Sequence, residues 1–535
     1  MDKTELIEEF LTDSAKILLI TRPRRFGKTL NLSTLKYFFD QENAQENRKL
    51  FKGLKVSENE KVMALQGTRP VIHLSFKDCK ANDWLKTEDM LYDLLQRMSL
   101  EHLSALIKVE HKLLQPILIV SQNQGNFADF CNLLFNLTRA YASIGPGPLI
   151  LIDEYDVPLQ SAWAEGYWDE AITFFRNFFS AGFKDNPNVW RAVITGCLRV
   201  ARESMFTGMN NLEAASVSSK GYARHFGFTV PEVKQLIQDY NLSAIDTQIE
   251  AWYNGYLFGE TTLYNPWSSL NLLKNQGEFR NYWINTSGND LVKEILSRTG
   301  AQAKRDLEDL MTGQSITVPL QEHVVFQEIE NSPANLWNFF YFTGYLKAVK
   351  IDGPSEAVKT RVQLKIPNLE IHHIFEDSVQ LWFQKSESSA LLPNLKNSLM
   401  SGNVTEICKA LRKLCDTSLS YFDASGNEPE KFYHGLVLGL MSYYSDTWHI
   451  RSNRESGLGR CDLLMTPKNP DHYGIVMEFK TMDSYEDSDL VACAKNALAQ
   501  IENRQYEQEL KSQGAAKILK MGIGFLGKKI EILAG

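Results

Sequence analysis

A short apolar stretch near the start of the chain runs directly into a Gly-Lys-Thr triplet that could bind phosphate. Gly27, Lys28 and Thr29 follow residues 17–20, a strand-like segment, and open a helical stretch, where a phosphate-binding loop belongs. Amides at the helix N-terminus would attract the β-phosphate, Lys28 would bridge the terminal phosphates, and Thr29 would ligate Mg²⁺. The pattern predicts an ATP–Mg²⁺ site whose loop residues are Arg25, Phe26, Gly27, Lys28, Thr29 and Leu30.

The loop departs from the usual consensus at its first position. The first glycine of the pattern GxxxxGK followed by Ser or Thr would fall at position 22, which is Arg22 here. An ordinary strand–turn–helix with a surface lysine is therefore the alternative interpretation of this segment.

A second apolar strand supplies the carboxylates that nucleotide hydrolysis needs. Residues 148–152 run into Asp153 and Glu154. Asp153 would hold Mg²⁺, directly or through water, and Glu154 would polarise the attacking water as a general base. A helix cap is the alternative role for such an acidic pair, but an apolar strand ending in Asp-Glu downstream of Gly-Lys-Thr favours the catalytic role.

A further apolar strand ends among polar candidates. Thr195 lies near its end and is placed to sense the γ-phosphate. Arg199 and Arg202 follow and are candidate phosphate-facing arginines, although single arginines more often form surface ion pairs.

Near the C-terminus, two acids and a lysine could form a metal-dependent hydrolytic centre. Asp462 begins one apolar stretch, and Glu478 and Lys480 end another. Residues two apart in a strand face the same side, so Glu478 and Lys480 would point together toward Asp462 if the strands are neighbours. The carboxylates of Asp462 and Glu478 and the Phe479 carbonyl would bind Mg²⁺ or Mn²⁺. Lys480 would position or deprotonate the attacking water.

This spacing also arises by chance, so a half-buried strand with a solvated tip is the alternative. Several neighbours favour the catalytic interpretation. A helix carrying Glu430 precedes the strands and could donate another carboxylate, and Gln500 and Tyr506 could face the metal or a nucleic-acid backbone. Glu455 is a further acid for which a loop ion pair is favoured. Local positive charge is expected from Arg451, Arg454 and Arg460.

The first two hundred residues alternate apolar strands with helical stretches, which predicts a parallel sheet covered on both faces. The expected strands are 17–20, 71–76, 149–152 and 189–195. The expected helices are 29–39, 87–107, 126–141 and 168–183.

The remainder is expected to be mainly helical over 228–312 and mixed thereafter. Before the last module we expect helices at 333–346, 369–385 and 403–415 and strands at 345–351 and 360–366. The last module is expected to contain helices 430–444 and 487–511 and strands 447–452, 461–465, 473–479 and 517–525.

The bulk composition is that of an ordinary globular protein. The chain has 535 residues, a net charge of −8 and 44% hydrophobic residues, so any nucleic-acid surface must be a local basic patch. Its seven cysteines contain no CxxC pair, which argues against a disulfide framework or a zinc site. Neither a signal peptide nor a membrane-length apolar run is visible. These features predict a cytoplasmic protein with no membrane partner.

Four longer segments resemble a known family: TRPRRFGKTLNLSTLKYFF, LIDEYDVPL, TGCLRVARESMFTGMNNL and the WYNGYLFG to LYNPWSSLNLL region. They resemble the AAA-ATPase-like family, over about residues 1–275. An arginine at the position of Arg22 is usual in that family, so the resemblance implies an intact loop. Family members generally begin upstream of the position of Asp2, so a truncated chain or a misassigned start is one expectation from the resemblance.

The C-terminal motifs, with YHGLVLGL at 433–440 and IPNLE at 366–370, resemble the PD-(D/E)XK nuclease-like domain that accompanies this family, over about 320–530. The expected fold class is α/β: a P-loop NTPase parallel sheet with a helical lid, followed by a mixed α/β nuclease-like domain. The expected boundaries are 1–227 for the ATPase core, 228–315 for the lid or accessory region, 316–422 for a connecting region of the nuclease-like module and 423–535 for the nuclease-like core.

Three functional hypotheses follow. ATP binding or hydrolysis could regulate phosphodiester cleavage of nucleic acid, with DNA favoured over RNA. The chain could instead be a nucleotide-dependent switch or scaffold whose C-terminal domain binds nucleic acid or protein without cleaving it. In the third, the nuclease is active while ATP is bound but not hydrolysed. A homo-oligomer is an open expectation. The aromatic residues Trp252, Tyr253, Trp267 and Trp337 suggest base stacking, but their apolar helical surroundings favour core packing.

Overall fold

The computed structural model divides the chain into two compact units, between which the backbone passes three times. One unit comprises Met1–Asn285 and Thr317–Glu370, and the other comprises Thr286–Ile316 and Ile371–Gly535. The structure describes all residues except 201–204, 207–208, 210, 243–245, 284–300, 312, 324–325, 330–331, 354–359, 385–390, 420–436, 438–440, 442–443, 457–458, 483–488, 504–505 and 527–528. Side chains at 246–247, 301, 304–305, 308, 327, 377–384, 414–419, 452–456 and 459–460 also lie outside the description.

A five-stranded parallel sheet forms the centre of the first unit, in the order β2-β3-β4-β1-β5. Its strands are β1 (Ile17–Thr21), β2 (Val71–Ser75), β3 (Leu149–Asp153), β4 (Arg191–Gly196) and β5 (Leu212–Ala215). Strands β1, β3 and β4 are buried along their whole length, as a sheet covered on both faces requires. The four expected strands and the parallel sheet are therefore confirmed, and β5 is an additional edge strand.

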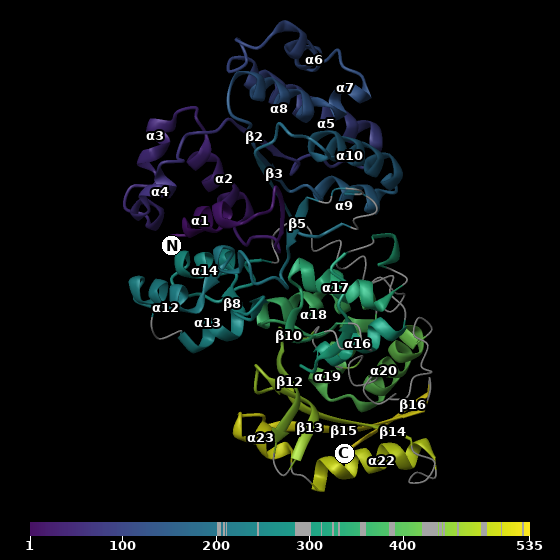
Figure 1. Ribbon diagram of the computed structural model, residues 1–535. Helices are drawn as coiled ribbons and strands as arrows, with labels where there is room; N and C mark the ends of the chain where they lie inside the picture. Colours follow the sequence, from purple (N-terminus) through teal and green to yellow (C-terminus); the bar gives the residue numbers. More distant parts are fainter. Residues whose placement is uncertain are drawn as a thin grey trace. The chain divides into compact units, whose positions relative to one another are not determined.

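Helices surround this sheet (Figure 1). They are α1 (Glu5–Thr12), α2 (Lys28–Phe39), α3 (Ala44–Lys49), α4 (Glu60–Met63), α5 (Trp84–Leu103), α6 (His111–Ser121), α7 (Phe127–Cys131), α8 (Leu133–Ile144), α9 (Val157–Glu165) and α10 (Trp168–Phe183). Helix α2 begins directly after the predicted phosphate-binding loop and packs against β3 and β4. The helix expected over 126–141 is interrupted at Asn132, which is both the C-cap of α7 and the N-cap of α8.

The region after β5 contains more strand than expected. It holds an antiparallel sheet in the order β6-β8-β7, with β6 (Phe228–Thr229), β7 (Tyr256–Phe258) and β8 (Thr261–Tyr264). Helices α12 (Val230–Asp239), α13 (Asp246–Tyr253) and α14 (Pro266–Lys274) accompany it. The region is mainly helical, as expected, but the aromatic residues of β7 and β8 form hairpin strands that the sequence did not predict. We call Val230–Lys274 together with β6 the accessory region.

The segment Thr317–Glu370 groups with the first unit, whereas we expected residues 316–422 to belong to the nuclease-like module. It holds α17 (Pro333–Thr343) and a sheet in the order β10-β11-β9, from β10 (Lys347–Asp352), β11 (Arg361–Lys365) and β9 (Ile316–Pro319). The physical reason is aromatic packing. The Phe326 ring lies 5.8 Å from that of Trp163 on α9 and 5.4 Å from that of Trp168 on α10.

The second unit contains a mixed five-stranded sheet in the order β12-β13-β14-β15-β16. Its strands are β12 (Trp448–Ser456), β13 (Gly459–Pro467), β14 (Tyr473–Thr481), β15 (Lys517–Leu526) and β16 (Lys529–Ala534). All pairs are antiparallel except β14 with β15, which is parallel. This arrangement confirms the expected mixed α/β fold of the C-terminal part.

The helices of this part are α16 (Ala301–Met311), α18 (Leu369–Gln384), α19 (Leu391–Ser401), α20 (Val404–Leu419), α22 (Leu490–Asn503) and α23 (Glu507–Ser512). Helix α22 packs against β14, β15 and β16. The single helix expected over 487–511 is two helices, and the helix expected over 430–444 lies mostly outside the described residues. Within the described part of the chain, we find no helix with the length and apolar character needed to span a bilayer.

Candidate functional sites in the two units

The side chains of Arg22 and Phe26 anchor the predicted phosphate-binding loop. Arg22, at the position where the consensus has glycine, is fully buried and donates hydrogen bonds of 2.8 Å to the Ala215 carbonyl and 3.2 Å to the Gly221 carbonyl. Burial lowers the pKa of Arg22 to about 9, so it remains cationic at neutral pH. The Phe26 ring is buried against Tyr256 and Phe258 of β7, at 4.9 and 5.1 Å between centroids. The side chains of Arg22 and Phe26 therefore tie the loop to the sheet and to the accessory region.

Lys28 lies inside the loop and is held by the chain itself. Its ammonium donates to the carbonyls of Arg22 and Pro23 at 3.2 and 3.3 Å, and lies 3.6 Å from a Glu154 carboxylate oxygen. Burial lowers the pKa of Lys28, but Cys197 and three nearby carboxylates raise it more, so that it lies above the ordinary value. Burial raises the pKa of the Cys197 thiol to about 12, so at neutral pH the carboxylates supply this effect. Lys28 is therefore a buried cation held at the N-terminus of α2.

Asp153 joins the loop to the sheet. Its carboxylate accepts hydrogen bonds of 2.6 Å from the Thr29 hydroxyl and 2.6 Å from the Thr195 hydroxyl. The structure thus brings together Thr29, Asp153 and Thr195, which come from three separate segments. The Thr195 hydroxyl is engaged by Asp153 in this arrangement. Hydroxyl and carboxylate oxygens are ligands that Mg²⁺ accepts, so Thr29 and Asp153 fit the metal of a bound nucleotide.

Glu154 and Gly27 have left-handed backbone conformations, with φ of 53° and 83° respectively. A positive φ is uncommon outside glycine and places the Glu154 side chain beside Lys28 instead of continuing the strand direction. To act as a general base, Glu154 would have to release Lys28 to the incoming phosphate and bind a water molecule instead. Leu30, by contrast, is 70% exposed, so only its backbone could contribute to the loop.

An acid that sequence reasoning did not single out lies behind these residues. Asp156 is fully buried and accepts hydrogen bonds from the amides of Cys197 and Leu198 at 3.0 and 2.9 Å, and from Gln160 at 2.8 Å. Arg24 of the loop donates to Gln160 at 3.1 Å, which extends this network to the phosphate loop. The Asp-Val-Pro sequence is typical of a helix N-cap, but Asp156 makes no side-chain cap bond on α9 and instead positions the segment after β4.

The predicted arginines have other partners. Arg199 forms an ion pair of 3.3 Å with Glu322, and Arg202 lies outside the described residues. Arg25, an exposed loop residue, places its guanidinium carbon 4.2 Å from the ring centroid of Trp267. Trp337 and Tyr253 are fully buried, which confirms core packing for these two aromatic residues.

The proposed nuclease centre lies where β13 and β14 begin and end. The strands pair with Leu463 opposite Met477, so Asp462 and Glu478 are the next residues along the same pair. The Asp462 carboxylate accepts a 2.9 Å hydrogen bond from the Phe479 amide, and the Asp462 amide donates to a Glu478 carboxylate oxygen at 3.4 Å. The two acids therefore lie together across adjacent strands.

Lys480 lies two residues beyond Glu478 on β14, and alternation along the strand places both on one sheet face. Glu478 is only 3% exposed, and Gln500 of α22 donates a hydrogen bond to its other carboxylate oxygen. Tyr506 is fully buried in the core under the sheet, so the interpretation that it faces a ligand was wrong. Arg451 is ion-paired with Glu509 at 3.1 Å. The candidates Glu430, Arg454, Glu455 and Arg460 lie outside the described side chains.

The donor set of this centre fits a hard divalent cation, since it offers the carboxylates of Asp462 and Glu478 and the backbone carbonyl of Phe479. Among the described residues, no group of three or more His, Cys, Asp or Glu side chains is arranged to hold a metal ion. A metal here would therefore depend on two carboxylates completed by the backbone and water.

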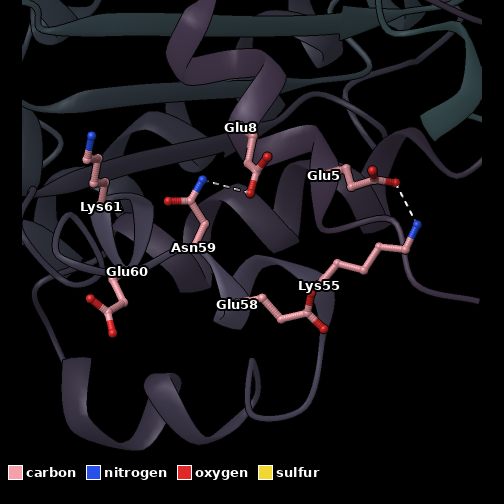
Figure 2. A pocket seen from close by; sticks show the side chains of 7 residues that line it. All are labelled: Glu5, Glu8, Lys55, Glu58, Asn59, Glu60 and Lys61. Carbon is pink, nitrogen blue, oxygen red and sulfur yellow. Dashed lines mark hydrogen bonds and ion pairs between the residues drawn. The ribbon is translucent and has the colours of Figure 1, made fainter.

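A surface hollow of about 670 Å³ lies on the first unit (Figure 2). Its lining residues are Glu5, Glu8, Lys55, Glu58, Asn59, Glu60 and Lys61. Lys55 pairs with Glu5 at 2.9 Å and Asn59 donates to Glu8 at 3.2 Å. None of the residues expected to bind nucleotide or metal lines this hollow.

Comparison with known families agrees with the two units. Residues 1–206 match the family model described as "Predicted AAA-ATPase", and residues 428–534 match the PD-(D/E)XK nuclease superfamily. The expected pairing of an AAA-ATPase-like domain with a PD-(D/E)XK nuclease-like domain is therefore confirmed. Domains of these two kinds support, in general terms, an ATPase function combined with a nuclease-like function.

The chain is also similar to a protein of Azotobacter chroococcum described as "Uncharacterized protein in vnfD 5'region". The two are 26% identical over 393 residues, which cover 73% of this chain and 68% of the relative. The similarity extends beyond the ATPase-like match, so the relative shares more of this chain than that domain alone.

Proposed function

We propose that this protein binds and hydrolyses ATP with Mg²⁺, and that its nucleotide state regulates metal-dependent cleavage of nucleic acid, with DNA as the favoured substrate. The observation that carries the cleavage half is the meeting of Asp462 and Glu478 across β13 and β14, with Lys480 on the same strand as Glu478. The observation that supports the ATP half is the cluster of Lys28, Thr29 and Asp153 around the N-terminus of α2.

In the first unit, the amides at the start of α2 would bind the β-phosphate and Lys28 would exchange its carbonyl partners for phosphate oxygens. Asp153 and Thr29 would hold Mg²⁺, which supplies charge neutralisation at the phosphates when bound. Glu154, released from Lys28, would orient the attacking water.

In the second unit, Asp462 and Glu478 would hold Mg²⁺ or Mn²⁺, which supplies Lewis-acid stabilisation of the charge at phosphorus. Gln500 orients the Glu478 carboxylate through its hydrogen bond. Lys480 would hold the attacking water or take its proton, on the face of β14 that Glu478 shares.

The test is degradation of linear and circular DNA, and of RNA, by the full chain with Mg²⁺ or Mn²⁺ and ATP. We expect cleavage by the wild-type protein and its loss, by at least two orders of magnitude, in Asp462→Ala and Lys480→Ala. Matched controls are the exposed residues of the same unit, Asp471→Ala and Lys468→Ala, which should retain cleavage. Equal activity in all five proteins would reject the assignment of the centre.

A second experiment tests whether ATP must be hydrolysed or only bound. If hydrolysis regulates cleavage, Glu154→Gln and a non-hydrolysable ATP analogue should both alter cleavage relative to ATP with the wild-type protein. If bound ATP is sufficient, both should support cleavage as well as ATP does.

A second candidate function is a nucleotide-dependent switch or scaffold that binds nucleic acid or protein without cleaving it. The enclosure of the Glu478 carboxylate by Gln500 and the Asp462 amide favours it, because a cation would have to displace or share these donors. It predicts ATP binding that Lys28→Ala abolishes, with no cleavage under any divalent metal.

A further inference from the structure

The exposed arginine of the phosphate loop rests on a tryptophan of the accessory region. The Arg25 guanidinium carbon lies 4.2 Å from the Trp267 ring centroid, within the range of a cation–π contact. Arg25 has a left-handed backbone, with φ of 68°, which a non-glycine residue seldom adopts. The rest of the loop therefore holds Arg25 in a backbone conformation that is unfavourable for a residue with a side chain.

Trp267 is held in place without help from Arg25. It lies in the first turn of α14, where the buried Asn265 side chain accepts hydrogen bonds from the amides of Trp267 and Ser268 at 2.9 and 3.3 Å. The indole Nε1 donates to the Tyr282 carbonyl at 3.1 Å, and the residue is 37% exposed. The ring is thus a fixed, partly open platform beside the loop.

A nucleotide polyphosphate would compete with this platform for Arg25. A cation–π contact at an exposed site is weak, whereas a guanidinium and a phosphate form charge-assisted, often bidentate hydrogen bonds. Arg25 belongs to the same loop as Gly27 and Lys28, so phosphates bound at the start of α2 would lie within reach of its long side chain. The stronger partner would therefore remove Arg25 from Trp267.

We propose that Arg25 is a specificity-determining residue that reads phosphate charge: it rests on Trp267 in the free protein and transfers to the phosphates when a nucleotide binds. This inference rests on the proposed binding of ATP. Since the attraction grows with the number of phosphates, a triphosphate displaces Arg25 more completely than a diphosphate does. Trp267 and the start of α14 thereby distinguish the two nucleotide states.

The test is tryptophan emission of the full chain during titration with MgATP and MgADP, with nucleotide occupancy measured by calorimetry on the same samples. Subtracting the Trp267→Phe response isolates Trp267 from the other tryptophans, of which the chain has ten in total. We expect a Trp267-dependent change that is larger with ATP than with ADP. In Arg25→Ala this change should disappear and the Kd for ATP should rise about tenfold, while Arg25→Lys should fall between.

The chain offers a matched control. Arg69 lies 4.4 Å from the ring centroid of Trp190, in a second arginine–tryptophan pair outside the phosphate loop. Trp190→Phe should leave the ATP-dependent emission change intact.

The outcomes separate this inference from the proposed function. Measured ATP binding with no Trp267-dependent change, or with the same change in Arg25→Ala, would overturn the inference and leave ATP binding standing. A folded wild-type protein that binds neither nucleotide would overturn both.

Discussion

The two candidate sites differ in what surrounds their acids. In the first unit a protein cation, Lys28, lies 3.6 Å from Glu154, and Asp153 is bound by two hydroxyls. In the second unit, backbone and side-chain amides donate hydrogen bonds to Asp462 and Glu478. A ligand at the first site would have to replace an internal cation, whereas a ligand at the second would have to displace or share amide donors. This contrast is the one expected if the first site takes an anionic ligand and the second a cation, as we propose.

Among these substitutions, Lys28→Ala is expected to have the largest effect on ligand binding at the first site. Removing the buried ammonium should weaken ATP binding at least a hundredfold, because a charge-assisted contact to phosphate is lost and Glu154 would repel the nucleotide. Calorimetry with MgATP measures this, and Lys36→Ala on the same helix is the control. Retention of wild-type affinity would mean that this loop is not the nucleotide site.

Glu370 offers a test of the first unit through pH. Its carboxylate accepts hydrogen bonds of 2.7 Å from the Ser268 hydroxyl and the Trp283 amide, and burial raises its pKa to about 7 from an ordinary 4.5. A carboxyl whose pKa is higher in the folded state contributes stability at low pH that is lost as pH rises through this window. The free energy of unfolding should fall by roughly 3 kcal/mol from Glu370 alone between pH 4.5 and 7.

Denaturant unfolding of Glu370→Gln and wild type across pH 4.5 to 7.5 would measure this contribution as a difference. The slope should be shallower in the variant, and the exposed Glu260→Gln should match the wild type. Parallel pH profiles for all three proteins would contradict the raised pKa.

Gln500→Ala tests metal binding at the second site. Loss of the donor that orients Glu478 should weaken Mn²⁺ binding at the second unit about tenfold, a typical effect of removing a residue that supports a metal ligand. Mn²⁺ titration without nucleotide measures it, with Gln513→Ala as the control in the same unit. An unchanged affinity would indicate that the metal does not use Glu478.

The smallest expected effect comes from Thr195→Val. It removes one of the two hydroxyls on Asp153 at nearly constant volume, which should cost about 1 kcal/mol of stability. It should also slow ATP turnover about fivefold if that energy is lost in the transition state. Thr195→Ser keeps the hydroxyl and should behave as the wild type, and a loss in both variants would assign the effect to packing instead.

The sequence predicted those parts of the fold that depend on local pattern. Strands β1, β3 and β4 and helix α2 are continuous apolar or periodic stretches, and their predicted bounds lie within two residues of the observed ones. Strand β5 was missed because Leu-Glu-Ala-Ala has no apolar run, and it is a strand only because it pairs with β1. The accessory sheet was missed for a similar reason, since its strands are two to four residues long.

The candidate sites show the same limit. The types and spacing of Thr29, Asp153, Asp462 and Glu478 identified residues that the fold does bring into hydrogen-bonded groups. Partners such as Asp156 and Cys197 could not be found in this way, because each joins the site through a fold contact between distant segments. The ion-pair partner of Arg199 could not be predicted either, since Glu322 lies more than a hundred residues later in the chain.

The three passages of the backbone between the units, at 285–286, 316–317 and 370–371, have a practical consequence. No single cut separates the ATPase-like part from the nuclease-like part, because a fragment ending at residue 285 would lack the Phe326 packing and α17. After a single proteolytic cut between residues 286 and 316, each unit would consist of segments from both fragments. Studies of either half are therefore better served by point substitutions in the whole protein than by truncation.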